Sequence, residues 1–174
     1  MDLLDRMLGQ DEWTTAKLIA LSQGLTDAQL DQDFDIGHRT LRATFDHMIL
    51  STEFWTGLMI GQPIPWESSH SPLSALLERH ERSYAIFADL ARRLQNEQRF
   101  DEVYIDHYDY PQTFGGTVLH VILHNCQHRG DVLHILQRLG VPDLPEADPQ
   151  EWEHDTQSFF ESDDLKEQTP QPAR

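Results

Sequence analysis

The amino-acid sequence predicts an all-α protein: a four-helix bundle with a short irregular hairpin between its third and fourth helices, followed by an acidic C-terminal tail. Three observations lead to this prediction. Apolar residues recur at three- and four-residue steps in four long segments, as they do on one face of an α-helix. Glycine and proline stand at the ends of these segments. The β-prone run between the last two segments is short and contains a proline.

The first predicted helix runs from Leu3 to about Leu21 and stops at Gly24. A polar link, 26–38, leads to the second predicted helix, which carries two apolar stripes and is broken after Met59 by glycine and proline. The two stripes are Leu41, Phe45, Met48, Thr52, Trp55 and Met59, and Ala43, His47, Leu50, Phe54 and Leu58. Two stripes indicate burial around much of the helix, so we expect it at the centre of the bundle or at a subunit interface.

The pair Ser71 and Pro72 predicts the start of the third helix, because a serine oxygen can cap free amides and proline suits a first turn. The helical period breaks over 100–114, where we expect the short hairpin. The fourth helix is predicted from about Thr117 to Leu139, with a stop at Gly140.

The negative charge is concentrated in the tail. The 174 residues include 13 basic and 30 acidic side chains, a net charge of −17, and residues 143–174 alone hold ten acidic residues against two basic ones. We therefore divide the chain into a bundle, 1–142, and an acidic extension, 143–174. We expect the last twenty or so residues to be mobile unless Trp152, Phe159 and Phe160 dock on the bundle.

Composition argues against several classes of protein. The single cysteine, Cys126, rules out an internal disulfide, and no segment approaches the roughly 20 apolar residues that span a membrane. A pI near 4.7 disfavours binding to nucleic acid or to an anionic membrane surface. No secretory signal pattern is present. We expect a cytoplasmic protein whose partners are small molecules or proteins.

The histidines are the residues that suggest chemistry. His120, His124 and His128 follow one another at four-residue steps on the fourth helix, so that neighbours project from one face about 6 Å apart. Two imidazoles at this spacing can chelate a transition metal, although a pair of hydrogen-bonded core histidines is the plain alternative. His124 and His128 interrupt an aliphatic stripe, where a shared cation would relieve the cost of burying both rings unpaired.

A third ligand would have to come from another helix. His47 in the second predicted helix and His80 in the third both interrupt apolar stripes. Sequence spacing does not choose between them.

Two segments carry a resemblance to a known family. LRATFDHMILSTEFW at 41–55, followed by LHVILHNCQHRGD at 119–131, resembles the DinB family of bacterial four-helix metalloproteins, and the similarity covers roughly 1–142. The resemblance implies a three-histidine site for a divalent transition metal, with zinc or nickel expected, made by His47, His124 and His128. It also implies a homodimer. Some members are thiol-dependent S-transferases and others are metal-dependent hydrolases, which implies a metal-dependent enzyme acting on a small molecule, such as a low-molecular-weight thiol.

The residues around the motif have their own interpretations. Asp131 stands where many family members carry Gln; it either accepts a hydrogen bond from a ligand imidazole or is a solvated helix residue, and we favour the latter. Arg129 is interpreted as the partner of an acidic neighbour, and Gly130 as allowing a close approach of helices. Cys126, rotated about 200° from His124, should face away from the metal as a small apolar residue.

Three nitrogen ligands leave a coordination position open, which is typical of catalytic or ligand-binding sites. Such a metal can polarise a carbonyl, activate water or hold a thiolate. No general base stands out. Glu53, His80, His107 and Tyr108 are candidates for the pocket, with Glu53 expected at the surface and His107 in the hairpin. His120 either supports a ligand or is an ordinary hydrogen-bonded core residue, and we favour the latter.

Two other functions remain open. The protein could be a non-catalytic metal- or ligand-binding module of a stress response. It could also be a dimerising bundle in which the histidines are structural and the second helix supplies the interface.

Overall fold

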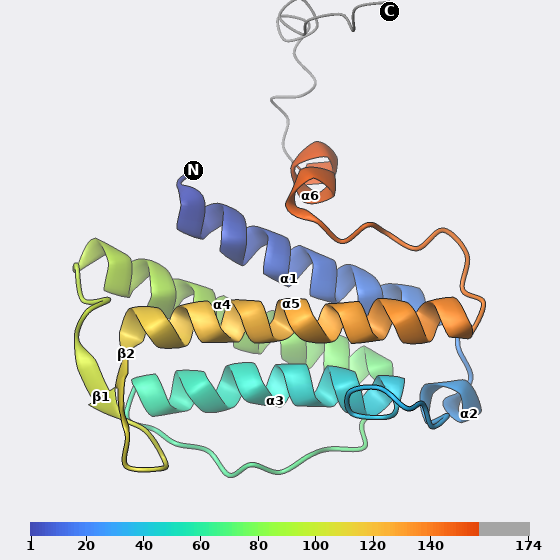
Figure 1. The fold of residues 1–174 in the computed structure, drawn as a ribbon, viewed down its shortest axis with the longest axis horizontal. Helices are drawn as coiled ribbons and strands as arrows, with labels where there is room; N and C mark the ends of the chain where they lie inside the picture. Colours follow the sequence, from blue (N-terminus) through green and yellow to red (C-terminus); the bar gives the residue numbers. More distant parts are fainter. Residues whose placement is uncertain (157–174) are drawn as a thin grey trace, which may run out of the picture.

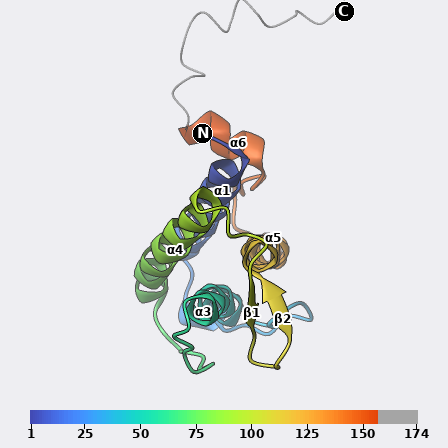
Figure 2. The same ribbon diagram turned by 90° about the vertical axis from the view of Figure 1, so that its left-hand side faces the viewer.

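The computed structural model describes residues 1–156 as a mainly helical chain, in agreement with the predicted all-α class. Four long helices pack side by side (Figure 1): α1 (Leu3–Ser22), α3 (Leu41–Met59), α4 (Leu73–Asn96) and α5 (Phe114–Arg138). Viewed end-on, α1 contacts α4 and α5, and α3 contacts the same two helices (Figure 2). This arrangement packs α3 against α5, and these two helices carry the predicted ligands.

Hydrogen-bonding side chains set where three of the long helices begin. Asp2, Thr40 and Thr113 accept hydrogen bonds from the free amides of α1, α3 and α5. Thr113 starts α5 three residues earlier than predicted. The predicted serine cap of α4 is wrong, because Pro72 is the N-cap and the Ser71 hydroxyl donates to Ser69 Oγ instead.

The apolar core has two parts separated by polar side chains. One cluster lies between the ends of the long helices near the short α2 (Asp27–Leu30), and the other lies toward the hairpin. Between them along α1 and α5 come buried polar residues, among them Asp11, Asn125 and Arg129. No residue of the two predicted stripes of α3 is exposed: the first is buried except for the partly buried Trp55, and in the second only Leu50 and Phe54 are buried. The homodimer therefore stays a prediction.

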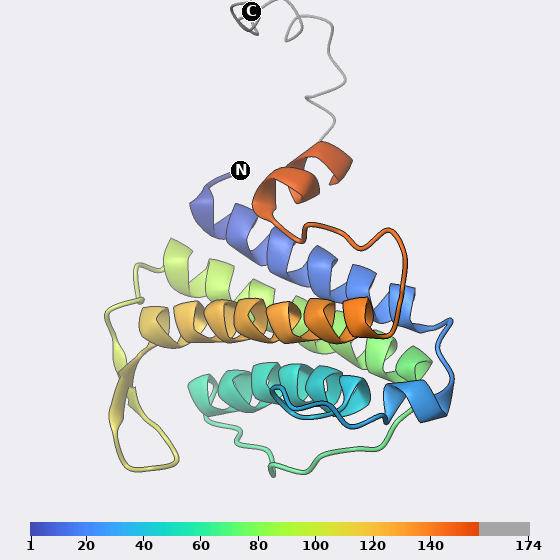
Figure 3. The ribbon, with the colours of Figure 1, turned by 45° about the vertical axis from the view of Figure 1, so that its right-hand side comes forward.

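The hairpin forms where the helical period was predicted to break. Strand β1 (Val103–Ile105) pairs antiparallel with β2 (Pro111–Thr113), and Ile105 stands opposite Pro111 at the end of the ladder. The turn is held by the Asp106 carboxylate, which accepts hydrogen bonds from the amides of Tyr108 and Tyr110. The hairpin leads directly into α5 and therefore lies beside the N-terminal end of that helix (Figure 3).

A short helix, α6 (Pro149–Thr156), packs on α1 (Figure 3). Trp152 is 5% exposed and covers Gly9, where a Cβ would lie 2.5 Å from the indole. Of the three aromatic residues of the acidic extension, Trp152 docks on the helices. Phe159 and Phe160 lie outside the described residues. The domain boundary at residue 142 stays a prediction. Among residues 1–156, no helix is long and apolar enough to cross a membrane.

Candidate metal centre

Four imidazole rings gather between α3, α5 and the loop that precedes α3. His124 Nε2 lies 2.9 Å from His47 Nε2 and 3.2 Å from His128 Nε2. His38, in the loop, stacks on His47 with ring centroids 3.6 Å apart. We call these four residues, His38, His47, His124 and His128, the histidine centre. The structure therefore brings together the three predicted ligands; their role as ligands stays a prediction.

His38 is the member that sequence reasoning missed. Ligand atoms of His38, His47 and His128 all lie within 4.8 Å of one another, which is a grouping suited to a metal ion. His38 precedes α3 and belongs to no helical stripe, so periodicity carried no signal for it. Only the path of the loop brings its ring to the centre.

Three rings of the centre, those of His38, His47 and His124, are neutral at pH 7. Burial, reinforced by neighbouring histidines, lowers the pKa of His47 to about 3 and that of His124 to about 4. Burial also lowers the pKa of His38. Neutral imidazole is the form that binds metal, so these environments prepare the nitrogens as ligands rather than as cations.

Asp131 orients His128. Its carboxylate Oδ2 lies 3.1 Å from His128 Nδ1 and its side chain is 19% exposed. The favoured interpretation of Asp131 as a solvated residue is therefore wrong. Because a carboxylate accepts from Nδ1–H, the lone pair of His128 is placed on Nε2, facing His124.

This donor set fits a divalent cation. Three Nε2 atoms converge, and hydrogen bonding between neutral rings can satisfy each close pair only if one nitrogen donates. Since His128 Nε2 carries a lone pair, His124 Nε2 can form a hydrogen bond with only one of its two neighbours, and the other pair of nitrogens is left unsatisfied. A cation shared by these nitrogens removes this conflict. Histidines that bind metals usually donate their other ring N–H to an acceptor such as a carboxylate.

A cavity of about 410 Å³ opens beside His124. Its lining is mainly aromatic and contains no charged carboxylate or amine: Ser51, Phe54, Trp55, Trp66, His107, Tyr108, His120 and His124. The hairpin contributes His107 and Tyr108, α5 contributes His120, and the loop after α3 contributes Trp66. His107 and His120 are therefore pocket residues, and both approach the Trp55 ring edge-on.

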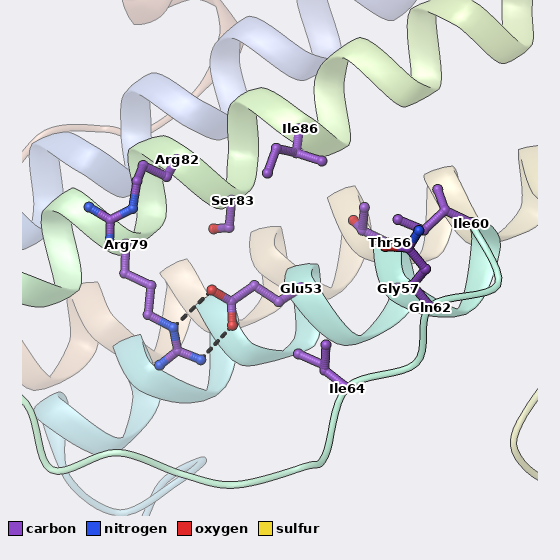
Figure 4. Close-up of a pocket in the computed structure, with 10 residues that line it drawn as sticks. All are labelled: Glu53, Thr56, Gly57, Ile60, Gln62, Ile64, Arg79, Arg82, Ser83 and Ile86. Carbon is purple, nitrogen blue, oxygen red and sulfur yellow. Dashed lines mark hydrogen bonds and ion pairs between the residues drawn. The ribbon is translucent and has the colours of Figure 1, made fainter.

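Two other candidates lie elsewhere. His80 is 2% exposed in the core, and its Nε2 is 3.2 Å from the carbonyl oxygen of Glu12. Glu53 is on the far side of α3, where it pairs with Arg79 at 2.9 and 2.5 Å along a groove of about 480 Å³ between α3 and α4 (Figure 4). Neither residue belongs to the histidine centre.

The comparison with known protein families decides the relationship. The model of the DinB superfamily matches residues 10–132 of the chain. The chain belongs to the DinB superfamily. No curated protein and no solved structure matches the chain.

The residues that follow His128 in the DinB motif have separate roles. Arg129 is 2% exposed and pairs with the buried Asp11 carboxylate, which confirms the predicted acidic partner. Gly130 has open space where a Cβ would lie, so the predicted close helix approach there is wrong. Cys126 is exposed, on the side of α5 away from the centre.

Proposed function

We propose that this DinB-superfamily protein is a metal-dependent enzyme that acts on a small molecule, of the thiol S-transferase or hydrolase type. In this proposal the four long helices form a four-helix bundle, and His47, His124 and His128 hold a divalent transition metal such as zinc or nickel. The observation that carries the proposal is the convergence of Nε2 atoms at 2.9 and 3.2 Å on His124. A bound metal would supply Lewis acidity toward a thiolate, water or carbonyl.

The side chains around the centre define the rest of the mechanism. Asp131 keeps His128 in the tautomer whose Nε2 is free to bind. The aromatic cavity next to His124 accommodates the organic part of the substrate and excludes water from it. Burial lowers the pKa of His120, so its ring is neutral at pH 7 and can accept the proton of a thiol or water in that cavity.

The first test is metal binding by the full chain prepared without a histidine tag. We expect wild-type protein to bind one divalent ion tightly. His124→Ala should weaken binding more than the about 10- to 100-fold typical of losing a residue that only supports a ligand. His134→Ala is the matched control, because His134 is an exposed histidine on the same helix. Wild-type protein that binds no divalent ion, or a His124→Ala variant that binds as well as wild type, would refute the site.

The second test separates an enzyme from a binding module. Metal-loaded protein is incubated with a small thiol and a model electrophile, and separately with model ester and amide substrates. We expect turnover in one of these assays that disappears in His124→Ala. Tight metal binding with no turnover would favour the non-catalytic module.

A further inference from the structure

We propose that His38 is a fourth metal ligand, which closes the coordination position left open by His47, His124 and His128 until a substrate displaces it. This inference rests on the proposed function, because it concerns the same metal. It adds a protein ligand from a loop to a set that otherwise comes from helices α3 and α5.

The position of the ring is the first argument. A ligand atom of His38 lies within 4.8 Å of ligand atoms of His47 and His128. Since each zinc–nitrogen bond is about 2.0–2.1 Å, two nitrogens on one ion are at most about 4.2 Å apart, so a small movement of the ring completes the set. The centroid of the His38 ring is 5.0 Å from that of His128 and 3.6 Å from that of His47.

The second argument is that the described part of the chain gives His38 no other polar partner. Among residues 1–156 its ring nitrogens take part in no hydrogen bond, and the ring is only partly buried. If His38 served only to fill space, an apolar aromatic residue in its place would stack equally well. One of the His38 nitrogens instead lies within 4.8 Å of ligand nitrogens of His47 and His128.

The loop backbone is the third argument. The residues on both sides of His38 have positive φ angles, +48° at Gly37 and +71° at Arg39. Arg39 is thus held in the left-handed region, which residues other than glycine rarely adopt. Gly37 also lies against the carboxylate that orients His128: a Cβ on Gly37 would be 2.6 Å from Asp131 Oδ2. The same carboxylate therefore positions one ligand directly and supports the loop that carries the proposed fourth.

The loop that carries His38 is anchored at both ends and is closed by backbone hydrogen bonds of its own. Phe34 is 3% exposed in the core, and Thr40 caps α3. The Phe34 amide donates to the Arg39 carbonyl oxygen at 2.7 Å, and the Arg39 amide donates to the Ile36 carbonyl oxygen at 2.8 Å. Because the His38 ring is only partly buried, rotation about its side-chain bonds would vacate the position for a thiolate or another donor without moving the loop.

The test uses Co²⁺ as the probe in the full chain, since its visible absorption reports the number and geometry of ligands. His38→Ala should weaken Co²⁺ binding at least about tenfold and change the absorption spectrum, and free imidazole should restore the wild-type spectrum. Gly37→Ala is the second variant: it keeps the ring but displaces the tip from Asp131, and we expect the same direction of change. His134→Ala should match wild type.

The outcomes separate this inference from the proposed function. If wild-type protein fails to bind Co²⁺, the proposed function fails. If wild type binds and His38→Ala has the same affinity and spectrum, only the fourth ligand is refuted. A changed spectrum that does not respond to imidazole would show an indirect effect and would also overturn the proposal. Circular dichroism of the metal-free variants checks that each is folded.

Discussion

Helix α5 carries two polar clusters on neighbouring residues, and they differ in how completely they are paired. One is the histidine centre, to which α5 contributes His124 and His128. The other, which we call the ionic core, consists of Asp11, Tyr84, Asn125 and Arg129. Asn125 directly follows His124, and Arg129 directly follows His128. Adjacent side chains on one helix therefore enter two different environments.

The ionic core is buried and its charges are compensated. Asp11 is completely buried and receives hydrogen bonds from Tyr84 Oη at 2.8 Å and Asn125 Nδ2 at 3.0 Å, besides its ion pair with Arg129. Burial lowers the pKa of Arg129 to about 10, which still leaves it charged at pH 7. The cluster ties α1, α4 and α5 together between the two apolar parts of the core.

The histidine centre is arranged in the opposite way. Its nitrogens face other nitrogens, and its one carboxylate, Asp131, engages a single ring. The comparison teaches that a polar cluster with matched partners stabilises the fold, whereas a cluster of converging neutral donors is suited to bind something else. Helix α3 repeats the contrast, because Asp46, which is fully paired, directly precedes His47.

The largest expected effect comes from breaking the ionic core. Arg129→Met removes the partner of a buried carboxylate, and we expect the free energy of unfolding to fall by about 3–5 kcal/mol in urea denaturation. The double variant Asp11→Asn with Arg129→Met should lose less, because no buried charge is left unpaired. A loss below about 1 kcal/mol in Arg129→Met would contradict a stabilising role for the ionic core. His124→Ala, by contrast, should weaken metal binding more than it weakens the apo fold.

A smaller effect should follow from loosening the histidine centre without removing a ring. Asp131→Ala takes away the acceptor of His128 Nδ1, and we expect metal affinity measured by chelator competition to fall about 10- to 100-fold. Asp131→Asn keeps an acceptor and should lie between this variant and wild type. Unchanged affinity in Asp131→Ala would show that His128 needs no such support.

The smallest effect tests the paired residue beside His47. Burial raises the pKa of Asp46, but hydrogen bonds from Ser68 and Ser69 and the Arg79 charge outweigh it, so the pKa is lowered below 3.8. The carboxylate therefore stabilises the fold above pH 3.8, and this contribution is lost as pH falls through the folded-state pKa. We expect Asp46→Asn to cost about 1–2 kcal/mol at pH 7.

The pH series supplies the control for that variant. In urea denaturation from pH 7 downward, the difference in stability between wild type and Asp46→Asn should shrink below pH 3.8. A difference that stays constant through this range would mean that the negative charge of Asp46 contributes nothing. Metal binding by Asp46→Asn should remain close to that of wild type if the two roles on α3 are separate.

Much of the fold was predictable because helical periodicity is local. The stripes and breakers predicted all four long helices to within a few residues, and Pro111 limited the strand pairing as expected. Short helices α2 and α6 were missed, since segments of one or two turns have too few residues for a period. The four-residue step of His124 and His128 predicted that both rings share a face, as they do.

The remaining features depend on chain segments that are distant in sequence. Asp131 follows His128 by three residues, a spacing that places both on one face, yet the spacing does not show that the Gly37 loop lies against the same carboxylate. Asp11 and Arg129 are 118 residues apart, and no local pattern predicts their meeting.

The sequence by itself thus determined the helices, the breaks between them and the set of histidines that α3 and α5 present, because backbone periodicity sets which side chains share a face. The tertiary structure decided which candidates meet. His80 pairs with a backbone carbonyl in the core and Glu53 with Arg79, while His38 reaches the centre through a loop with two positive φ angles. Helix register and loop path follow from packing across the whole chain. Residue spacing along one helix carries no information about that packing.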